Sequence, residues 1–274
     1  MIKNKAVNWS FDVEAFHVFR KDLWPIVEAV PGFLNISEAF FLYQTAKTLG
    51  GSSREIDQPK AGSVVEIGSY KGRSSVALAL GIKHHPTDTY KLYCIDPFFD
   101  GEVDSDLQSE FQQNITSAEV ADIATSVPRY SIDAAKSWPP TEGISFLFID
   151  GNHEYEFVRD DFLYWSRFLV PGGVVAFHDP YLIGVRVALD KFLFGNDAYQ
   201  QVCIIDGNLV AASRSDSWPT PRQRAIKKRV YWALRTKTTS PYMAILRMIV
   251  AAIDRPFGSL RRFFVEKLPV KDIN

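Results

Sequence analysis

The central part of the chain alternates short apolar runs with segments of helical periodicity, and this pattern constrains the fold more than any other feature. Four apolar runs have the length of buried strands: residues 63–68, 91–96, 144–150 and 173–179. Helix-like segments lie at 72–82, 104–116, 133–138 and 154–169. Such alternation is typical of a parallel sheet with helices on both faces. Two further runs, 201–206 and 208–214, meet at Asp206-Gly207, a hairpin signal. We therefore predict an α/β fold in which an antiparallel pair closes an otherwise parallel, doubly wound sheet.

Helical patterns flank this core on both sides. We predict an N-terminal helical cap over residues 1–60, the core over 61–214 and a helical extension over 215–274. The expected apolar face of the first helix consists of Phe16, Phe19, Leu23, Ile26 and Val30. Pro31-Gly32 ends that helix, and Asn35 with Glu38 predicts a capping box at the start of the next. Thr220-Pro221 and Ser240-Pro241 predict two helix starts in the extension.

Charge separates the extension from the rest of the chain. Residues 1–215 carry 18 basic and 28 acidic side chains, whereas residues 216–274 carry 13 basic and 4 acidic ones. The basic cluster consists of Arg222, Arg224, Lys227, Lys228 and Arg229. It leaves three alternatives open: peripheral contact with an anionic membrane or an acidic glycan carrier, packing on the acidic body of a second copy in a homo-oligomer, or a solvated helix face. Nucleic acid is disfavoured as a partner because the body is acidic.

Composition restricts the setting in which the protein works. No apolar run approaches the roughly 18 residues that a membrane span needs, and the N-terminus lacks the apolar region of a secretory signal. The two cysteines, Cys94 and Cys203, both lie in apolar runs and form neither a disulfide framework nor a metal cluster. We therefore expect a cytoplasmic protein.

A glycine-containing turn follows the first strand, in the segment VEIGSYKGRSS at 65–75. Gly68 lets the backbone come close to a ligand, Gly72 opens the next helix, and Glu66 ends the strand. Such a turn can cradle a nucleotide-like ligand at the carboxyl edge of a sheet. The alternative is a tight turn with glycines needed only for packing. The dinucleotide fingerprint is absent, because Tyr70 stands where that motif has glycine.

Polar side chains end three further strands. Asp96 could accept both hydroxyls of a ribose, or it could simply start a loop before proline. Asp150 is followed by His153, and the next strand ends in His178 and Asp179. If the two strands are neighbours, these four side chains converge, and their oxygen and imidazole ligands suit a divalent metal. Taken singly, each aspartate could be a helix cap and His178 an ordinary edge histidine.

Together these motifs resemble a known family. The segments in question are EIGSYKG, CIDPF, FIDGNHEY and VPGGVVAFHDP, in that order. They look like class I S-adenosylmethionine-dependent methyltransferases, and within them the metal-dependent O-methyltransferases of the macrocin and mycinamicin sugar-methylating type. The resemblance to catechol O-methyltransferase is more distant. The resemblance to the class I methyltransferases covers about residues 32–214. It implies a seven-stranded Rossmann-like sheet whose last strand is antiparallel.

The resemblance also implies roles for individual residues. The residues implied to bind S-adenosylmethionine are Glu66, Gly68, Ser69, Tyr70, Gly72, Ser74, Asp96, Ser131 and Asp133. Asp150, His178 and Asp179 match metal ligands, with Mg²⁺ or Mn²⁺ as the expected ion, and His153 matches the catalytic base. The chain departs from the family at His178, where relatives have a carboxylate, and imidazole is a poor partner for Mg²⁺.

The implied reaction is methyl transfer to a hydroxyl of a sugar, a glycan or a glycosylated natural product. In that reaction Asp150 would help hold the metal that lowers the pKa of the hydroxyl, and His153 would remove its proton. Two other functions stay open: a catalytically silent binding or scaffold protein on the same fold, and an NAD(P)-dependent sugar-modifying enzyme. The second lacks its expected glycine fingerprint.

Overall fold

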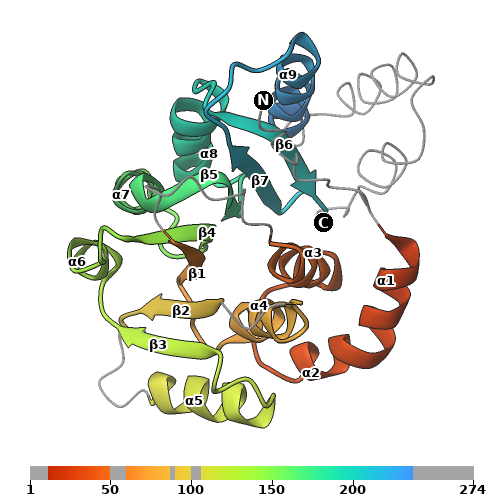
Figure 1. The fold of residues 1–274 in the computed structure, drawn as a ribbon, viewed down its shortest axis with the longest axis vertical. Coiled ribbons are helices and arrows are strands. Elements are labelled where there is room, and N and C mark those ends of the chain that lie inside the picture. The colour runs from red at the N-terminus through yellow and green to blue at the C-terminus, as the bar shows by residue number, and fades with distance from the viewer. Residues whose placement is uncertain (1–11, 50–59, 87–89, 100–105, 237–274) are drawn as a thin grey trace, which may run out of the picture.

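The computed structural model describes residues 12–49, 60–86, 90–99 and 106–236. Within these ranges the chain forms one seven-stranded sheet with the order β3-β2-β1-β4-β5-β7-β6 (Figure 1). The strands are β1 (Lys60–Ile67), β2 (Lys91–Asp96), β3 (Ala124–Pro128), β4 (Glu142–Ile149), β5 (Leu169–His178), β6 (Tyr199–Ile205) and β7 (Leu209–Arg214). The first five strands pair in parallel, and β7 runs antiparallel to both β5 and β6. The predicted sheet and its antiparallel last strand are confirmed.

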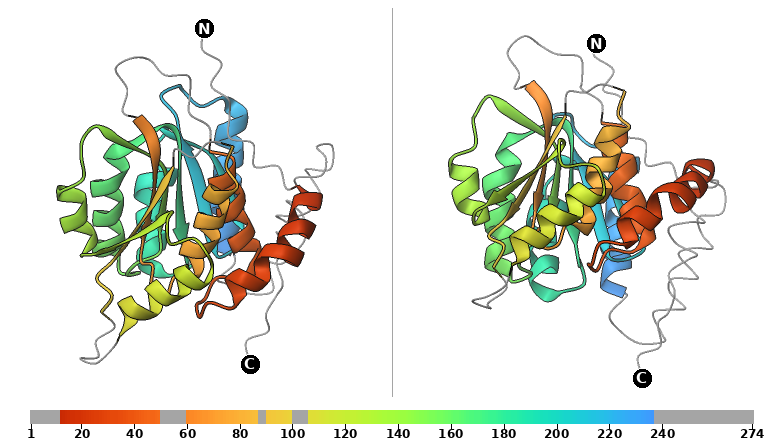
Figure 2. Two further views of the ribbon diagram at one scale, coloured as in Figure 1. Left: turned by 60° about the horizontal axis from the view of Figure 1, so that its bottom comes forward. Right: turned by 90° about the horizontal axis from the view of Figure 1, so that it is seen from below.

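Helices cover both faces of the sheet (Figure 2). The α-helices are α1 (Val13–Val18), α2 (Trp24–Glu28), α3 (Ile36–Lys47), α4 (Arg73–Lys83), α5 (Leu107–Ser117), α6 (Ser131–Lys136), α7 (Tyr155–Trp165), α8 (Ile183–Ala188) and α9 (Pro221–Thr236). Helices α3, α4 and α5 bury one face in a core that includes Phe111, Phe146 and Phe148. Helices α6 to α9 bury the other face around Trp165 and Phe177. Buried apolar strands between two helical layers explain why the strand runs are continuous and not alternating.

The predicted apolar face of the first helical segment is confirmed at Phe19 and Val30, which are buried, but is wrong at Ile26. A π-helical turn, η1 (Phe19–Leu23), joins α1 to α2. Each π turn holds one residue more than an α turn, so the residues after it rotate relative to the α-helical pattern. Val27 is consequently fully buried, whereas Ile26, which the regular spacing placed in the core, is 37% exposed.

Two elements are present that the sequence did not reveal. Strand β3 lies at the edge of the sheet and carries only two fully apolar residues before its proline, so it has no continuous apolar run. Helix α8 has six residues and passes directly into a second π-helical stretch, η3 (Leu189–Phe194). Short elements of this kind give little periodicity for a sequence pattern to detect.

The basic helix α9 packs against the edge strand β6 and does not stand free. Its predicted start is confirmed, since Thr220 and Gln223 cap each other reciprocally. Lys227 is buried and donates to the carbonyls of Asn196 and Tyr199 at 2.6 and 2.8 Å. The second predicted start, Ser240-Pro241, lies outside the described residues. No helix in the described ranges is long and apolar enough to cross a membrane.

Candidate functional site

The carboxyl ends of β1, β4 and β5 meet at one place on the sheet edge. Ile67 of β1 pairs with Ile149 of β4, and Ile149 pairs with Phe177 of β5. The residues that follow these strands, among them Gly68, Asp150 and His178, therefore emerge side by side. This is the edge at which ligands bind in open α/β sheets.

The glycine turn between β1 and α4 is held in a conformation that few residues adopt. Gly68, Tyr70 and Gly72 have φ values of 85°, 47° and 94°. A Cβ atom at Gly68 would lie 2.2 Å from the backbone oxygen of Asp150, so only glycine fits there. The turn thus packs directly on the residue that ends β4. Ser69 and Ser74, two other predicted cofactor residues, lie buried in the same turn and at the start of α4.

Asp96 lies opposite this turn at the end of β2. Its Oδ2 accepts a hydrogen bond from the Tyr70 backbone N–H at 2.8 Å, and its Oδ1 accepts one from the Phe98 N–H at 2.6 Å. A carboxylate offers about four lone-pair sites, so about two remain for a ligand. The residue can therefore orient the turn and still accept two ribose hydroxyls.

Glu66 does not emerge at this edge. Its side chain is fully buried behind the turn and accepts hydrogen bonds from the hydroxyls of Ser69 and Ser75. Burial raises the pKa of Glu66 to about 7, and these serine hydroxyls oppose the rise. The structure therefore places Glu66 under the turn, as a group that holds the turn's serines.

Ser131 and Asp133 lie at the start of α6, beyond Asp96. The Ser131 hydroxyl accepts a hydrogen bond from the Trp165 indole N–H at 2.8 Å. Asp133 is largely exposed and forms an ion pair with Lys136 at 3.5 Å. Both side chains already have protein partners, and neither contacts the glycine turn in the hydrogen bonds of the described residues.

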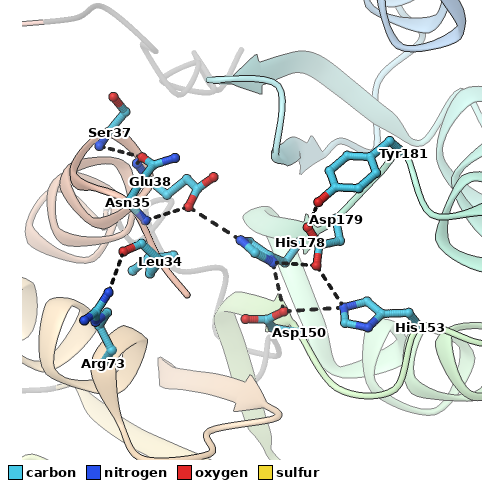
Figure 3. A network of polar contacts seen from close by, with 10 residues as sticks. All are labelled: Leu34, Asn35, Ser37, Glu38, Arg73, Asp150, His153, His178, Asp179 and Tyr181. Carbon is cyan, nitrogen blue, oxygen red and sulfur yellow. Dashed lines mark hydrogen bonds and ion pairs between the residues drawn. The ribbon is translucent and has the colours of Figure 1, made fainter. Parts of the chain in front are cut away.

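The four polar residues that end β4 and β5 do converge (Figure 3). His178 Nδ1 lies 3.1 Å from Asp150 Oδ1 and 3.4 Å from Asp179 Oδ2. His153 Nε2 lies 3.4 Å from the same Asp179 oxygen and 3.9 Å from Asp150 Oδ1. Two carboxylates and two imidazoles thus surround one small volume.

The N-terminal helical segment contributes a fifth group that the sequence did not assign to the site. Glu38 of α3 is fully buried, and its Oε2 lies 3.5 Å from His178 Nε2 on the side away from Asp150 (Figure 3). The same oxygen accepts the Asn35 backbone N–H at 2.9 Å, which confirms the predicted capping box. Tyr181 also belongs to the network, since its hydroxyl donates to Asp179 Oδ1 at 2.8 Å.

Arg73, the first residue of α4, ties the chain before Glu38 to the glycine turn. Its guanidinium donates to the backbone oxygens of Glu28, Val30 and Leu34 at 3.2, 2.6 and 3.2 Å. Three bonds from one planar group fix the connection between α2 and α3. The placement of Glu38 therefore depends on the same helix that follows the turn.

The charged groups at this site shift one another's pKa values. Burial alone would lower the pKa of His178, but its contacts with Asp150, Asp179 and Glu38 raise that pKa to about 12. The Asp150 carboxylate nearby raises the pKa of His153 above its ordinary value. Burial would raise the pKa of Asp179, yet the neighbouring His178 lowers it below its ordinary value. The site without a metal therefore holds an imidazolium among carboxylates.

The residues present fit a divalent metal. One ligand atom each from Asp150, His153 and His178 lie within 4.8 Å of one another. Among the described side chains, His153 Nε2, His178 Nε2 and Glu38 Oε1 are buried atoms without a hydrogen-bond partner. Oxygen and imidazole ligands together suit Mn²⁺ or another transition metal better than Mg²⁺. Because metals bind neutral imidazole, a metal ligated by His178 would displace its proton.

Comparison with known proteins agrees with this geometry. Residues 65–180 match the model of a family described as a methyltransferase domain. The structure of the O-methyltransferase NovP aligns with a TM-score of 0.52 and 18% identity, over 66% of this chain and 81% of that one. A cofactor-bound structure of Rv0187 from MTB aligns with a TM-score of 0.51 and 17% identity, over 75% of this chain and 92% of that one. At these identities the two structures show a shared fold.

The family match begins in β1 and ends just after β5, so it contains the glycine turn, Asp96 and the polar ends of β4 and β5. The seven-stranded sheet with its antiparallel β7 adds independent support, because it is the sheet expected of the class I fold. Residues 65–180 therefore match a methyltransferase domain, and the sheet around them has the strand order of that fold.

Proposed function

We propose that the protein is an O-methyltransferase that acts on a hydroxyl of a sugar or a glycosylated natural product, with help from a divalent metal. One observation carries the proposal. The His153 imidazole shares a small volume with Asp150 and Asp179, and the backbone of Asp150 packs against the Gly68 turn. A base and a cation site therefore adjoin the turn where the methyl donor would bind.

His153 is the group that would accept the proton of the hydroxyl. Its Nε2 has no hydrogen-bond partner among the described residues, so its lone pair can take a proton. The Asp150 carboxylate nearby raises the pKa of His153, which makes it a better base and stabilises the imidazolium once it forms. General-base help of this kind typically accelerates a reaction by about 10²–10⁴-fold.

The other groups would prepare the two reactants. S-adenosylmethionine supplies a methyl group already activated by its sulfonium charge, and Asp96 would orient it through the ribose. Asp150, Asp179 and His178 would hold the metal, which as a Lewis acid favours the deprotonated acceptor hydroxyl. Glu38 and Tyr181 fix the orientation of His178 and Asp179 from behind. The sugar acceptor rests on the motif resemblance to sugar O-methyltransferases.

The test is production of S-adenosylhomocysteine with a panel of glycosides and catechols, with and without Mn²⁺. In His153→Ala, turnover should fall by about 10²-fold or more while S-adenosylhomocysteine still binds. His17→Ala is the matched control, since His17 lies exposed on α1. Full turnover in His153→Ala would remove the assignment of the base. A folded wild-type protein that binds no S-adenosylhomocysteine would contradict the function itself and favour a silent scaffold.

A further inference from the structure

A cavity of about 720 Å³ opens beside His153, on the side of the site away from Glu38. One wall is the end of the connection from β4 to α7, with His153 and Glu154, together with the start of α7, with Glu156. The opposite wall is Leu182 and helix α8. The volume falls in the range of about 300–1,000 Å³ that small-molecule sites occupy. Since His153 both lines this cavity and contacts Asp150 and Asp179, a molecule bound here can present a hydroxyl to the base.

The two walls are fixed against each other at their base. A Cβ atom at Gly184 would lie 2.2 Å from the His153 backbone oxygen and 2.5 Å from the Tyr155 nitrogen. The backbones of α8 and of the His153 segment are therefore in direct contact. Lys191 in turn holds Tyr155. The Lys191 Nζ donates to the Tyr155 hydroxyl at 3.1 Å and lies 5.1 Å from the centre of the Tyr155 ring. The cavity is thus largely formed before a ligand arrives.

The α8 wall is apolar and exposed. Leu182, Ile183 and Val187 line the cavity, and Ile183 is 72% exposed. Isolated exposed apolar side chains are common on proteins, but three on one cavity wall offer a continuous surface for an aromatic or aliphatic group.

The opposite wall is acidic. Glu154 and Glu156 are exposed, line the cavity, and make no ion pair among the interactions that the structure describes. No lysine or arginine in the described part of the chain lines the cavity with them. Two cations lie nearby: Arg159 interacts with Glu156 but is paired with Asp160 at 2.6 Å, and Lys191 donates to the Tyr155 hydroxyl. The three carboxylates outnumber these two cations, so the wall keeps an excess of negative charge at neutral pH, which favours a cationic ligand and disfavours an anionic one.

We infer that this cavity is the acceptor site, and that the acceptor is an amine-bearing hydroxyl compound with an apolar portion. The apolar portion packs on Leu182, Ile183 and Val187, the ammonium lies near Glu154 and Glu156, and one hydroxyl reaches His153. The inference rests on the proposed function and adds the chemical class of the acceptor. An amino sugar attached to an apolar aglycone has all three features.

The test compares three glycosides that share a phenyl ring and a hydroxylated sugar but differ in charge. They are phenyl 2-amino-2-deoxy-β-D-glucoside, phenyl β-D-glucoside and phenyl β-D-glucuronide, which are cationic, neutral and anionic. Each is titrated by calorimetry into protein saturated with S-adenosylhomocysteine. We expect the cationic glycoside to bind about tenfold more tightly than the neutral one, since each exposed carboxylate contributes a factor of up to about five. The preference should shrink in about 0.5 M salt.

Glu154→Gln and Glu156→Gln keep the size of the wall and remove its charge, so the double variant should bind the cationic and neutral glycosides equally. Glu14→Gln removes an exposed glutamate on α1 and should keep the preference. If the glycosides bind equally to the wild type, if the glucuronide binds best, or if none binds to the S-adenosylhomocysteine complex, the inference is overturned and the proposed function stands. Failure to bind S-adenosylhomocysteine would instead overturn the proposed function.

Discussion

Replacing Glu38 by glutamine isolates the charge that helix α3 contributes to the site. Glutamine keeps the side-chain length and can still accept the Asn35 N–H, so the capping box survives. The substitution removes a fully buried carboxylate that lies 3.5 Å from His178 Nε2. The expected effect is therefore electrostatic, with little contribution from packing or helix capping.

The size of the effect follows from the pair and its surroundings. Two unit charges at 3.5 Å attract by about 5 kcal/mol at an effective dielectric of about 20. Two terms reduce this gain: Asp150 and Asp179 still neutralise His178, and the variant no longer buries a second charge. We expect Glu38→Gln to lower the free energy of unfolding of the metal-free protein by about 1–3 kcal/mol. At about 2–4 °C per kcal/mol, the melting temperature should fall by roughly 2–12 °C.

The loss should also depend on pH in a definite direction. The pKa of His178 is raised from its ordinary 6.5 to about 12, so its stabilisation is fully present below pH 6.5 and is lost as the pH rises through 12. Removing Glu38 lowers that pKa, so the difference in stability between variant and wild type should be constant below the variant's lowered pKa and should shrink only as the pH rises from there through 12. Urea unfolding followed by tryptophan fluorescence in a chelator measures it, with Glu14→Gln as control. A loss below about 0.5 kcal/mol at pH 7 would refute the ion pair.

Three further predictions follow from single contacts. Gly68→Ala should abolish S-adenosylhomocysteine binding and lower the melting temperature, because the alanine Cβ would lie 2.2 Å from the Asp150 backbone oxygen. Retained binding in a calorimetric titration would show that the turn can move. Asp96→Asn should weaken S-adenosylhomocysteine binding by about tenfold or more and cost about 1–3 kcal/mol of stability, because asparagine can accept only one of the two backbone N–H groups that Asp96 accepts; unchanged affinity would remove Asp96 from the cofactor site. Lys227→Met should cost about 1–3 kcal/mol of stability by removing the ammonium that donates to the Asn196 and Tyr199 carbonyls, of which only Asn196 keeps a second donor among the described residues, the Tyr199 N–H; a neutral result in urea unfolding would mean that α9 does not depend on this contact.

The sequence predicted those parts of the site that local patterns encode. Gly68, Asp150 and Asp179 each follow an apolar strand, and the carboxyl ends of neighbouring parallel strands must meet at one edge. The hairpin at Asp206-Gly207 was also predicted from a local signal. Both residues have the positive φ that the turn requires, 47° and 76°.

Other features depend on contacts that no local pattern contains. Glu38 was recognised as a capping residue, but its second role appears only when α3 packs beside the end of β5. The burial of Val27 in place of Ile26 follows from the π turn before it, which a regular helical repeat cannot anticipate. The roles of the individual cofactor and metal residues, and the three-part division of the chain, stay predictions.

The measurement that bears most directly on this account is a calorimetric titration of the purified, chelator-treated protein with S-adenosylhomocysteine, repeated after addition of Mn²⁺. The account predicts one binding site that Asp96→Asn weakens and that His153→Ala leaves intact, together with Mn²⁺ binding that depends on Asp150. A well-folded protein that binds no S-adenosylhomocysteine, with or without Mn²⁺, would contradict the central claim.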